Sequence, residues 1–451
     1  MTEQLTLVDL PEGGDRGFRP IQYLGNKWRV LDVIERTVER HCAPGSTVCD
    51  LFAGSGVVAH RLGRRRTVLA ADIQEYSRVL TLALLRPAGV EGTALDDLLD
   101  RGTKYYEQIA AGPYGDLIEY EREAVAAALR ARPESLCGVI EHGSVFAHAH
   151  GAEQTPAELA RLLVAAGAAL PAEPGTVVSR YYGGVYFSYR QAAMLDGLAT
   201  AVRELPDHQR HTGLAAVLGT ASDLVSTVGN QFAQPIRPRQ KDGRPKAAAV
   251  AAVARRRGLC GVDLFRAWLP RYGRLTATSA PHVFRRDDYR RVLAQLPADV
   301  GMVYADPPYT RDHYSRFYHV LETLAVGDEP MVSTMKVNGV VKLSRGLYRA
   351  ERHQSPFCIK SEVLPAFEAL FGGTAHRGVP IAVSYSAYSS GTAARPQPRL
   401  VTIEQIAAVA GRYYRRVLVE SAGRVAHSKF NHEAVNGEVN YDAETLIVAH
   451  D

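Results

Sequence analysis

The chain has 451 residues, of which 46% are hydrophobic and 22% are charged. This composition is typical of a globular protein and excludes a disordered or fibrous chain. No run of roughly 20 apolar residues could span a membrane. Residues 1–19 are polar rather than signal-like, so we expect a cytoplasmic protein without a membrane partner. The net charge of +5 permits an acidic partner such as nucleic acid but does not require one.

The five cysteines are widely spaced in the sequence. They form no C-x-x-C pair, and no histidine stands at the spacing of a zinc site. We therefore expect neither disulfides nor a bound metal. The cysteines are Cys42, Cys49, Cys137, Cys260 and Cys358.

The first region, from Ile21 to about Leu85, has an α/β pattern. A helical run over 26–41 precedes an apolar strand over 47–51, a glycine turn and a helix, and a second strand follows over 67–71. This order predicts the opening βαβ unit of a doubly wound, Rossmann-like sheet.

The glycine turn is the first candidate site. Gly54 and Gly56 follow the strand directly, as backbone that turns tightly and approaches a ligand closely must do. Asp72 ends the next strand, where a doubly wound fold presents a carboxylate to ribose hydroxyls. A simple tight turn and a solvated acid would explain each feature alone, but together they predict an adenosine-bearing ligand. S-adenosylmethionine fits best, because Asp50 could receive its ammonium group and no full G-x-G-x-x-G is present.

Upstream of this unit, the segment 22–27 offers an aromatic ring, a glycine and a lysine just before a helix. Taken alone, helix capping by Asn26 explains it.

The region from about Pro87 to Leu275 is rich in alanine and leucine. Helices are predicted over 116–131, 156–169 and 191–205, and the region is interpreted as a mainly helical insertion. Aromatic residues crowd a glycine pair over 180–189, a pattern that fits ordinary packing and base stacking equally well.

A basic segment lies within this region. Its eight cations would follow a phosphate backbone and make binding depend on salt. We hypothesise that the helical region recognises a target sequence while this segment clamps the duplex. A solvated loop is the alternative. The eight cations are Arg237, Arg239, Lys241, Arg244, Lys246, Arg255, Arg256 and Arg257.

The α/β pattern resumes from His282, with strands predicted over 300–305, 379–385 and 441–449 and a helix over 363–371. The first of these strands leads into Asp306-Pro-Pro-Tyr309, the most specific motif of the chain. Two prolines fix the backbone and remove two donors, which leaves the Asp306 carboxylate and the Pro307 carbonyl as acceptors. Such acceptors would favour the pyramidal amine nitrogen that attacks a sulfonium methyl group.

Aromatic and cationic residues complete this predicted site. Tyr309 offers a face on which an extruded base can stack, because a base within the duplex cannot be reached. The segment that follows mixes cations and aromatics, and His313, Tyr314 and Arg316 are predicted, as a group, to contact DNA. The start of a polar helix is the alternative explanation for any one of them.

These motifs resemble those of the Dam-type DNA adenine methyltransferases. Residues 23–27 are similar to their N-terminal cofactor motif, 50–56 to the glycine motif, Asp72 to the ribose acid and 306–309 to the catalytic tetrad, in the same order. The resemblance implies a cofactor site of Tyr23, Gly25, Lys27, Asp50, Phe52, Ala53, Gly54, Ser55, Gly56, Asp72 and Ile73. It implies that the catalytic segment Asp306, Pro307, Pro308 and Tyr309 holds the adenine. The long helical region departs from the smaller members, and the strand before Asp306 lacks a convincing acidic motif.

The predicted organisation is a cofactor-binding half over 18–90, the helical insertion over 91–274, and a catalytic half over 275–451. The predicted activity is methyl transfer from S-adenosylmethionine to N6 of a flipped adenine in duplex DNA. N4-cytosine methylation, RNA adenine methylation and a catalytically silent DNA-binding protein are the alternatives. No nuclease or helicase signature is evident, so a role in restriction or phage defence would require a separate partner protein.

Overall fold

The computed structural model describes residues 18–21, 27–151, 155–278, 280–308, 314–337, 339–386, 390–392, 395–397, 400–421 and 444–451. Its largest sheet has seven strands in the order β10-β11-β7-β4-β1-β2-β3. All neighbouring pairs are parallel except those of β11, which runs antiparallel to β7 and β10. The strands are β1 (Thr47–Asp50), β2 (Val68–Asp72), β3 (Val283–Arg286), β4 (Val300–Ala305), β7 (Ile381–Tyr385), β10 (Arg416–Ser421) and β11 (Thr445–His450).

Helices cover both faces of this sheet because its central strands alternate between two apolar cores. Val48 and Tyr304 face α1 (Leu31–His41) and α2 (Val57–Gly63), whereas Cys49 and Val303 face the opposite side. That side is covered by α13 (Tyr289–Ala294), α16 (Val363–His376) and α17 (Ile403–Ala410). The mixed α/β architecture with a mostly parallel sheet is compatible with the predicted Rossmann-like methyltransferase fold.

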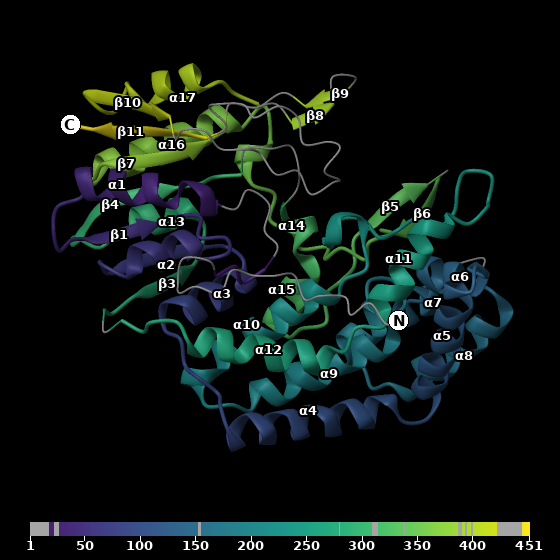
Figure 1. Cartoon of the computed structure of the whole chain (residues 1–451). Coiled ribbons are helices and arrows are strands. Elements are labelled where there is room, and N and C mark those ends of the chain that lie inside the picture. Colours follow the sequence, from purple (N-terminus) through teal and green to yellow (C-terminus); the bar gives the residue numbers. More distant parts are fainter. Residues whose placement is uncertain are drawn as a thin grey trace.

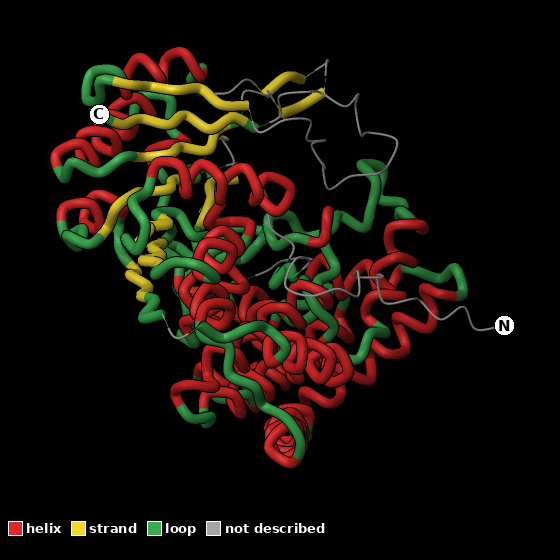
Figure 2. The backbone as a smooth tube through the Cα atoms, turned by 60° about the vertical axis from the view of Figure 1, so that its left-hand side comes forward, coloured by secondary structure: helices red, strands yellow, loops and turns green. Residues whose placement is uncertain are grey.

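A second, helical part lies beside the sheet (Figures 1 and 2). Its helices come after α3 (Glu75–Leu85) and before β3 in the chain, and they include the helices predicted over 116–131, 156–169 and 191–205. Some of them share an apolar core with α3 and α15 (His319–Val326), and the others pack in a second core around Leu117, Leu159 and Val253. The helices are α4 (Thr93–Ala110), α5 (Pro113–Leu129), α6 (Glu134–His142), α7 (Val145–Ala149), α8 (Ala157–Ala169), α9 (Tyr189–Arg203), α10 (Asp207–Leu224), α11 (Ala247–Arg257) and α12 (Gly261–Gly273).

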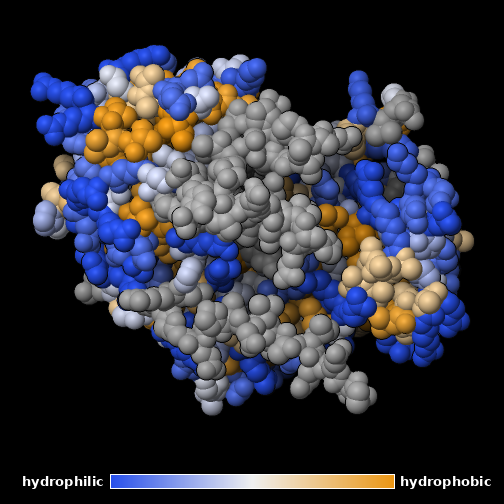
Figure 3. Space-filling view, turned by 45° about the horizontal axis from the view of Figure 1, so that its top comes forward, coloured by the Kyte–Doolittle hydropathy of each residue, from blue (hydrophilic) through white to orange (hydrophobic). Residues whose placement is uncertain are grey.

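The remaining elements are short. They are η2 (Lys27–Val30), η3 (Pro174–Thr176), η4 (Val178–Tyr182), η5 (Val228–Asn230), α14 (Tyr314–Phe317), η6 (Pro356–Cys358), the hairpin β5 (Thr334–Val337) and β6 (Val340–Leu343), and the hairpin β8 (Ser390–Thr392) and β9 (Arg395–Gln397). Figure 3 shows a face of the molecule on which hydrophobic residues gather in separate areas among hydrophilic ones. No described helix has the length and apolar character needed to cross a membrane.

The predicted strands 47–51, 67–71, 300–305 and 379–385 agree with β1, β2, β4 and β7 to within two residues at each end. The last predicted strand begins at residue 441, outside the described residues, and corresponds to β11. Strands β3 and β10 were not predicted from the sequence. Both are edge strands whose side chains are largely exposed, so they lack the apolar run that identifies a buried strand.

Candidate active site

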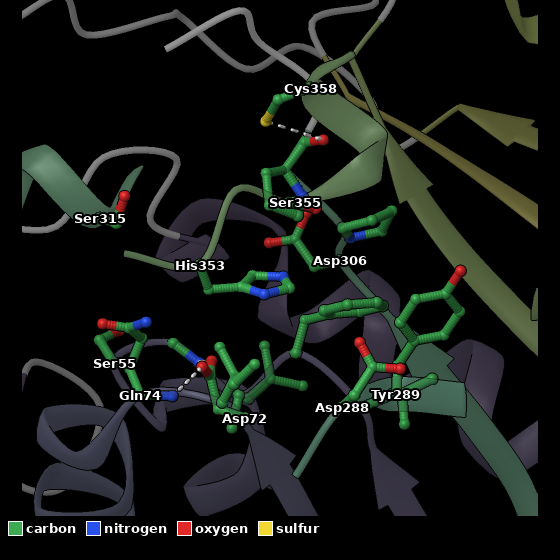
Figure 4. Close-up of a pocket in the computed structure, with 18 of the residues that line it drawn as sticks. Ser55, Asp72, Gln74, Asp288, Tyr289, Asp306, Ser315, His353, Ser355 and Cys358 are labelled. Carbon is green, nitrogen blue, oxygen red and sulfur yellow. Dashed lines mark hydrogen bonds between the residues drawn. The ribbon is translucent and has the colours of Figure 1, made fainter. Parts of the chain in front are cut away.

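A pocket opens at the carboxyl ends of β1, β2 and β4. The chain leaves β1 toward β2 on one side and returns through β4 on the other, so this is the switch point of the sheet, where open α/β folds bind ligands. Figure 4 shows Ser55 and Asp72 on one side of the pocket and Asp306 on the other. The two predicted half-sites, separated by more than 230 residues in the sequence, therefore line one cavity.

The turn after β1 requires its glycines. Gly54 and Gly56 have φ values of 53° and 79°, which side-chain-bearing residues adopt at a cost. A Cβ atom on Gly56 would also lie 2.7 Å from the hydroxyl oxygen of Thr81 on α3. The turn therefore brings bare backbone and the start of α2 to the pocket wall.

Asp72 fastens this turn to the end of β2. Its two carboxylate oxygens accept the backbone N–H groups of Gly54 and Gln74, each at 3.0 Å. Burial raises the pKa of Asp72, and these hydrogen bonds oppose the rise. Each carboxylate oxygen can accept a further bond, so this pocket-lining acid can still receive ribose hydroxyls.

Asp50 has a different environment, directly behind the pocket wall. It is 1% exposed, and neither carboxylate oxygen has a hydrogen-bond partner in the described part of the chain. Burial and the charges of Asp306 and Asp72 raise its pKa to about 8, and the nearby backbone N–H of Ala59 offsets this only in part. A buried carboxylate without a partner is costly, and an ammonium group would satisfy it.

Asp306 lies at the end of β4, and one of its two carboxylate oxygens is paired. Its Oδ2 is 2.8 Å from the Nζ of Lys27, which also lies 3.3 Å from the Oε1 of Glu444. Its Oδ1 is buried and has no hydrogen-bond partner among the described residues. Burial raises the pKa of Asp306 to about 6; Lys27 lowers it and Glu444 raises it. The carboxylate thus presents one unsatisfied acceptor oxygen.

Aromatic side chains form another wall of the pocket. Phe52 lies edge-on to Phe357, with ring centroids 5.6 Å apart, and at the same distance from the ring of Tyr289. Pro307 and Pro308 follow Asp306 along the lining. An apolar wall beside polar acceptors suits a planar heterocycle.

Most of the other predicted cofactor residues also line the pocket. They are Lys27, Phe52, Ala53, Gly54, Ser55, Asp72 and Ile73. Lys27 does so by pairing with Asp306, a contact that its place in the sequence did not indicate. Gly56 caps α2 next to the lining. Tyr23, Gly25, Tyr309 and His313 lie outside the described residues.

Several lining residues were missed by sequence reasoning. His353, Ser355 and Cys358 come from the segment after β6, and Asp288 and Tyr289 from the start of α13 (Figure 4). Glu444, just before β11, reaches Lys27 and accepts a hydrogen bond from the Ser384 hydroxyl at 2.6 Å. None of these residues belongs to a local motif, so only the folded arrangement identifies them.

The structure corrects the predicted DNA-contacting set at Arg257. Its side chain is fully buried and paired with Glu121, so it cannot reach a phosphate, and the prediction for this residue was wrong. Arg256 is partly buried and donates to the carbonyl of Asp223 at 2.7 Å. Arg239 is held by Glu134 and Glu141.

The other predicted cations remain accessible. Arg237, Lys241, Arg244, Lys246, Arg255 and Arg316 are exposed. Arg244 pairs with its neighbour Asp242, an ion pair that solvent weakens. The backbone of Tyr314 begins α14. Phosphate contact by these residues stays a prediction.

The aromatic cluster over 180–189 is part of the core. Tyr182, Tyr186, Phe187 and Tyr189 are 0% exposed. Packing, rather than base stacking, is therefore the correct interpretation of this segment.

No group of three or more histidine, cysteine or acidic side chains suited to a metal occurs among the described residues. The described cysteines are all free thiols.

Two comparisons bear on this pocket. Residues 23–121 match the family of D12 class N6 adenine-specific DNA methyltransferases, which confirms the resemblance to adenine methyltransferases drawn from the motifs. The chain is also 38% identical over 65 residues to the modification methylase LlaI of Lactococcus lactis subsp. lactis. That alignment covers 14% of this chain and 10% of the relative. The family match spans the glycine turn and Asp72 but ends well before Asp306.

Proposed function

We propose that the chain is an S-adenosylmethionine-dependent methyltransferase that modifies N6 of adenine in duplex DNA at a specific sequence. The observation that carries the proposal is the single pocket in which the glycine turn, Asp72 and Asp306-Pro-Pro308 meet. The D12 class match independently supports an adenine DNA methyltransferase.

The adenine side of the pocket supports this chemistry through Asp306. Its Oδ1, which has no partner among the described residues, and the carbonyl of the pocket-lining Pro307 would accept the two N6–H bonds. Drawing both hydrogens into fixed acceptors makes the nitrogen lone pair less delocalised into the ring and more nucleophilic. With a pKa of about 6, Asp306 is ionised at neutral pH and can perform this role.

The residues on the other side fit S-adenosylmethionine. Asp50, behind the pocket wall, has a buried carboxyl group without a partner among the described residues, which an ammonium group would hold in its ionised form. Asp72, which lines the pocket, can accept ribose hydroxyls. The cofactor supplies an electrophilic methyl group on sulfur. Phe52 and the glycine turn would keep water from the reacting centre, because they close the pocket wall between the two halves.

The substrate base must leave the duplex to reach Asp306, whose side chain is only 21% exposed at the end of β4. We therefore propose base flipping, with the helical part serving as the target-recognition region beside the pocket. Since the relative is named a modification methylase, we also propose a role in restriction–modification, which would require a separate nuclease partner.

The proposal is tested by incubating the protein with tritiated S-adenosylmethionine and unmethylated genomic DNA, followed by digestion to nucleosides. The expected label is N6-methyl-2′-deoxyadenosine from the native chain and none from Asp306→Ala. Label in N4-methylcytosine or only in RNA would overturn the proposed substrate. Cofactor binding without any transfer would indicate a silent DNA-binding protein.

A further inference from the structure

A cluster of arginines surrounds the ring of Tyr348. The guanidinium carbons of Arg316 and Arg352 lie 5.6 and 5.5 Å from its ring centroid. Arg345 is also close enough for its charge to lower the pKa of Tyr348, which burial raises. Guanidinium groups stay charged inside proteins, so three positive charges converge on one phenol ring.

Arg316 and Arg352 have no compensating acid among the described residues. In the described part of the chain, neither Arg316 nor Arg352 has a hydrogen bond or ion pair from its guanidinium group, and the Nε of Arg352 is buried without a partner. Burial and the charge of Arg316 lower the pKa of Arg352. By contrast Arg349, in the same segment, makes a two-pronged pair with Asp328 at 2.6 Å.

This arrangement costs free energy in the unliganded protein, because like charges repel and a buried donor is unsatisfied. Stacking on Tyr348 offsets only part of that cost. Paired donors from two arginines match the oxygens of a phosphate group. The cluster therefore has the character of an anion site.

Two arginines of this cluster are neighbours, in the sequence, of residues that line the pocket. Ser315 and His353 line the pocket (Figure 4), and Arg316 and Arg352 are their immediate neighbours in the chain. Consecutive Cα atoms are about 3.8 Å apart, so the backbone of both arginines lies directly beside the pocket lining.

The segment that holds Arg345 and Tyr348 is hydrogen-bonded to residues just before the basic segment, residues 237–257. Arg345 donates to the carbonyl of Ile236 at 2.6 Å, and the Tyr348 hydroxyl donates to that of Ala233. The charge of the exposed Arg237 reaches Arg345. Glu141, the acid that also reaches Arg345, is engaged by Arg239. Positive charge therefore continues from the arginines around Tyr348 to the start of the basic segment.

We propose that Arg316 and Arg352, positioned by Tyr348, bind one phosphodiester group of duplex DNA next to the nucleotide that enters the pocket. This inference rests on the proposed function for the identity of the duplex substrate. It adds Arg352 and Tyr348 to the DNA surface, and it gives Arg316 a specific ligand.

The test compares Arg316→Gln, Arg352→Gln and the double variant with the native chain. Their affinities for a fluorescent 30-base-pair duplex of arbitrary sequence are measured by anisotropy at several salt concentrations. If the two arginines share one phosphate, each variant binds roughly tenfold more weakly at low salt. The slope of the logarithm of the association constant against the logarithm of salt concentration then becomes less steep by about 0.9 in the double variant, not by twice that amount.

Arg122→Gln is the matched control, since Arg122 is an exposed arginine on α5 that pairs with Glu119. It should leave both affinity and salt slope as in the native chain. Arg349→Gln is the control for a structural arginine, and it should lower the melting temperature. The Arg316 and Arg352 variants should melt at the native temperature or above, because no ion pair is lost.

Unchanged affinity and slope in the double variant would overturn the proposal, as would a loss of S-adenosylmethionine affinity with DNA affinity intact. Duplex binding requires no turnover, so the two proposals fail separately. If the native chain transfers methyl groups to DNA but the double variant keeps the native salt slope, only the phosphate site is wrong. If the double variant has a reduced slope but the native chain transfers no methyl group to DNA, only the proposed function is wrong.

Discussion

Buried carboxylates of the helical part have hydrogen-bond or ion-pair partners, whereas some carboxylate oxygens at the edge of the sheet lack them among the described residues. In the helical part, Glu121 pairs with Arg257, and Asp196 accepts hydrogen bonds from the backbone and hydroxyl of Ser179 at 2.7 Å. At the sheet edge, both oxygens of Asp50 and the Oδ1 of Asp306 have no partner among the described residues. Satisfied acids hold helices in register, whereas unsatisfied acids are costly and persist where a ligand completes them.

The largest expected effect is a loss of stability when a paired, buried acid of the helical part is replaced. Glu121→Gln leaves Arg257 as a buried charge without a carboxylate, so we expect the free energy of unfolding to fall by about 3–5 kcal/mol. Urea denaturation measures this change. Glu119→Gln, on the same helix but in an exposed pair, should have little effect. Equal effects of the two substitutions would contradict the contrast between the two parts.

Asp306→Asn should lower kcat for methyl transfer by about 100- to 1000-fold, because it weakens an acceptor that acts on the reacting amine. The melting temperature should not fall, since Lys27 keeps Glu444 as its partner. Initial rates and thermal unfolding test the two expectations together. A loss of stability as large as that of Glu121→Gln would make Asp306 a structural residue instead.

Asp50 allows the contrast to be tested through pH. Its pKa in the folded protein is about 8, well above the ordinary value of 3.8. Its contribution to stability is therefore full below about pH 4 and is lost as the pH rises through 8. Asp50→Asn should stabilise the protein above pH 8 by about 1–3 kcal/mol and weaken S-adenosylmethionine binding.

Melting temperatures measured from pH 5 to 9 check the stability change, and calorimetric titration checks the cofactor affinity. A variant that melts below the native chain at pH 8.5 would show that Asp50 has a stabilising partner when ionised.

The smallest expected effect is a shift in the pH profile. Activity requires ionised Asp306, so kcat/KM should fall as the pH drops through about 6. Glu444→Gln removes a negative charge that raises this pKa, and the acid limb should move to lower pH by up to about one unit. Glu420 on β10 faces Arg40 and Thr37 of α1, so Glu420→Gln should leave the acid limb in place. A move to higher pH would show that Glu444 acts only by holding Lys27.

Local sequence determined the parts of this protein that depend on neighbouring residues. The apolar runs over 47–51 and 300–305 predicted buried strands, and the glycine turn and the Asp-Pro-Pro-Tyr tetrad marked the ends of those strands. Patterns of this kind are readable because strand burial and backbone conformation are set within a few residues. The order of motifs was enough to indicate an adenine methyltransferase, in agreement with the D12 class match.

Tertiary structure decided what depends on distant residues. The pairing of Lys27 with Asp306 and Glu444, the burial of Arg257, and the meeting of Arg316 and Arg352 on Tyr348 all join segments far apart in the chain. A cation in the sequence is equally compatible with a phosphate contact and with a buried ion pair. Only its burial and its neighbours separate the two, because the cost of a buried charge depends on which groups the fold places around it.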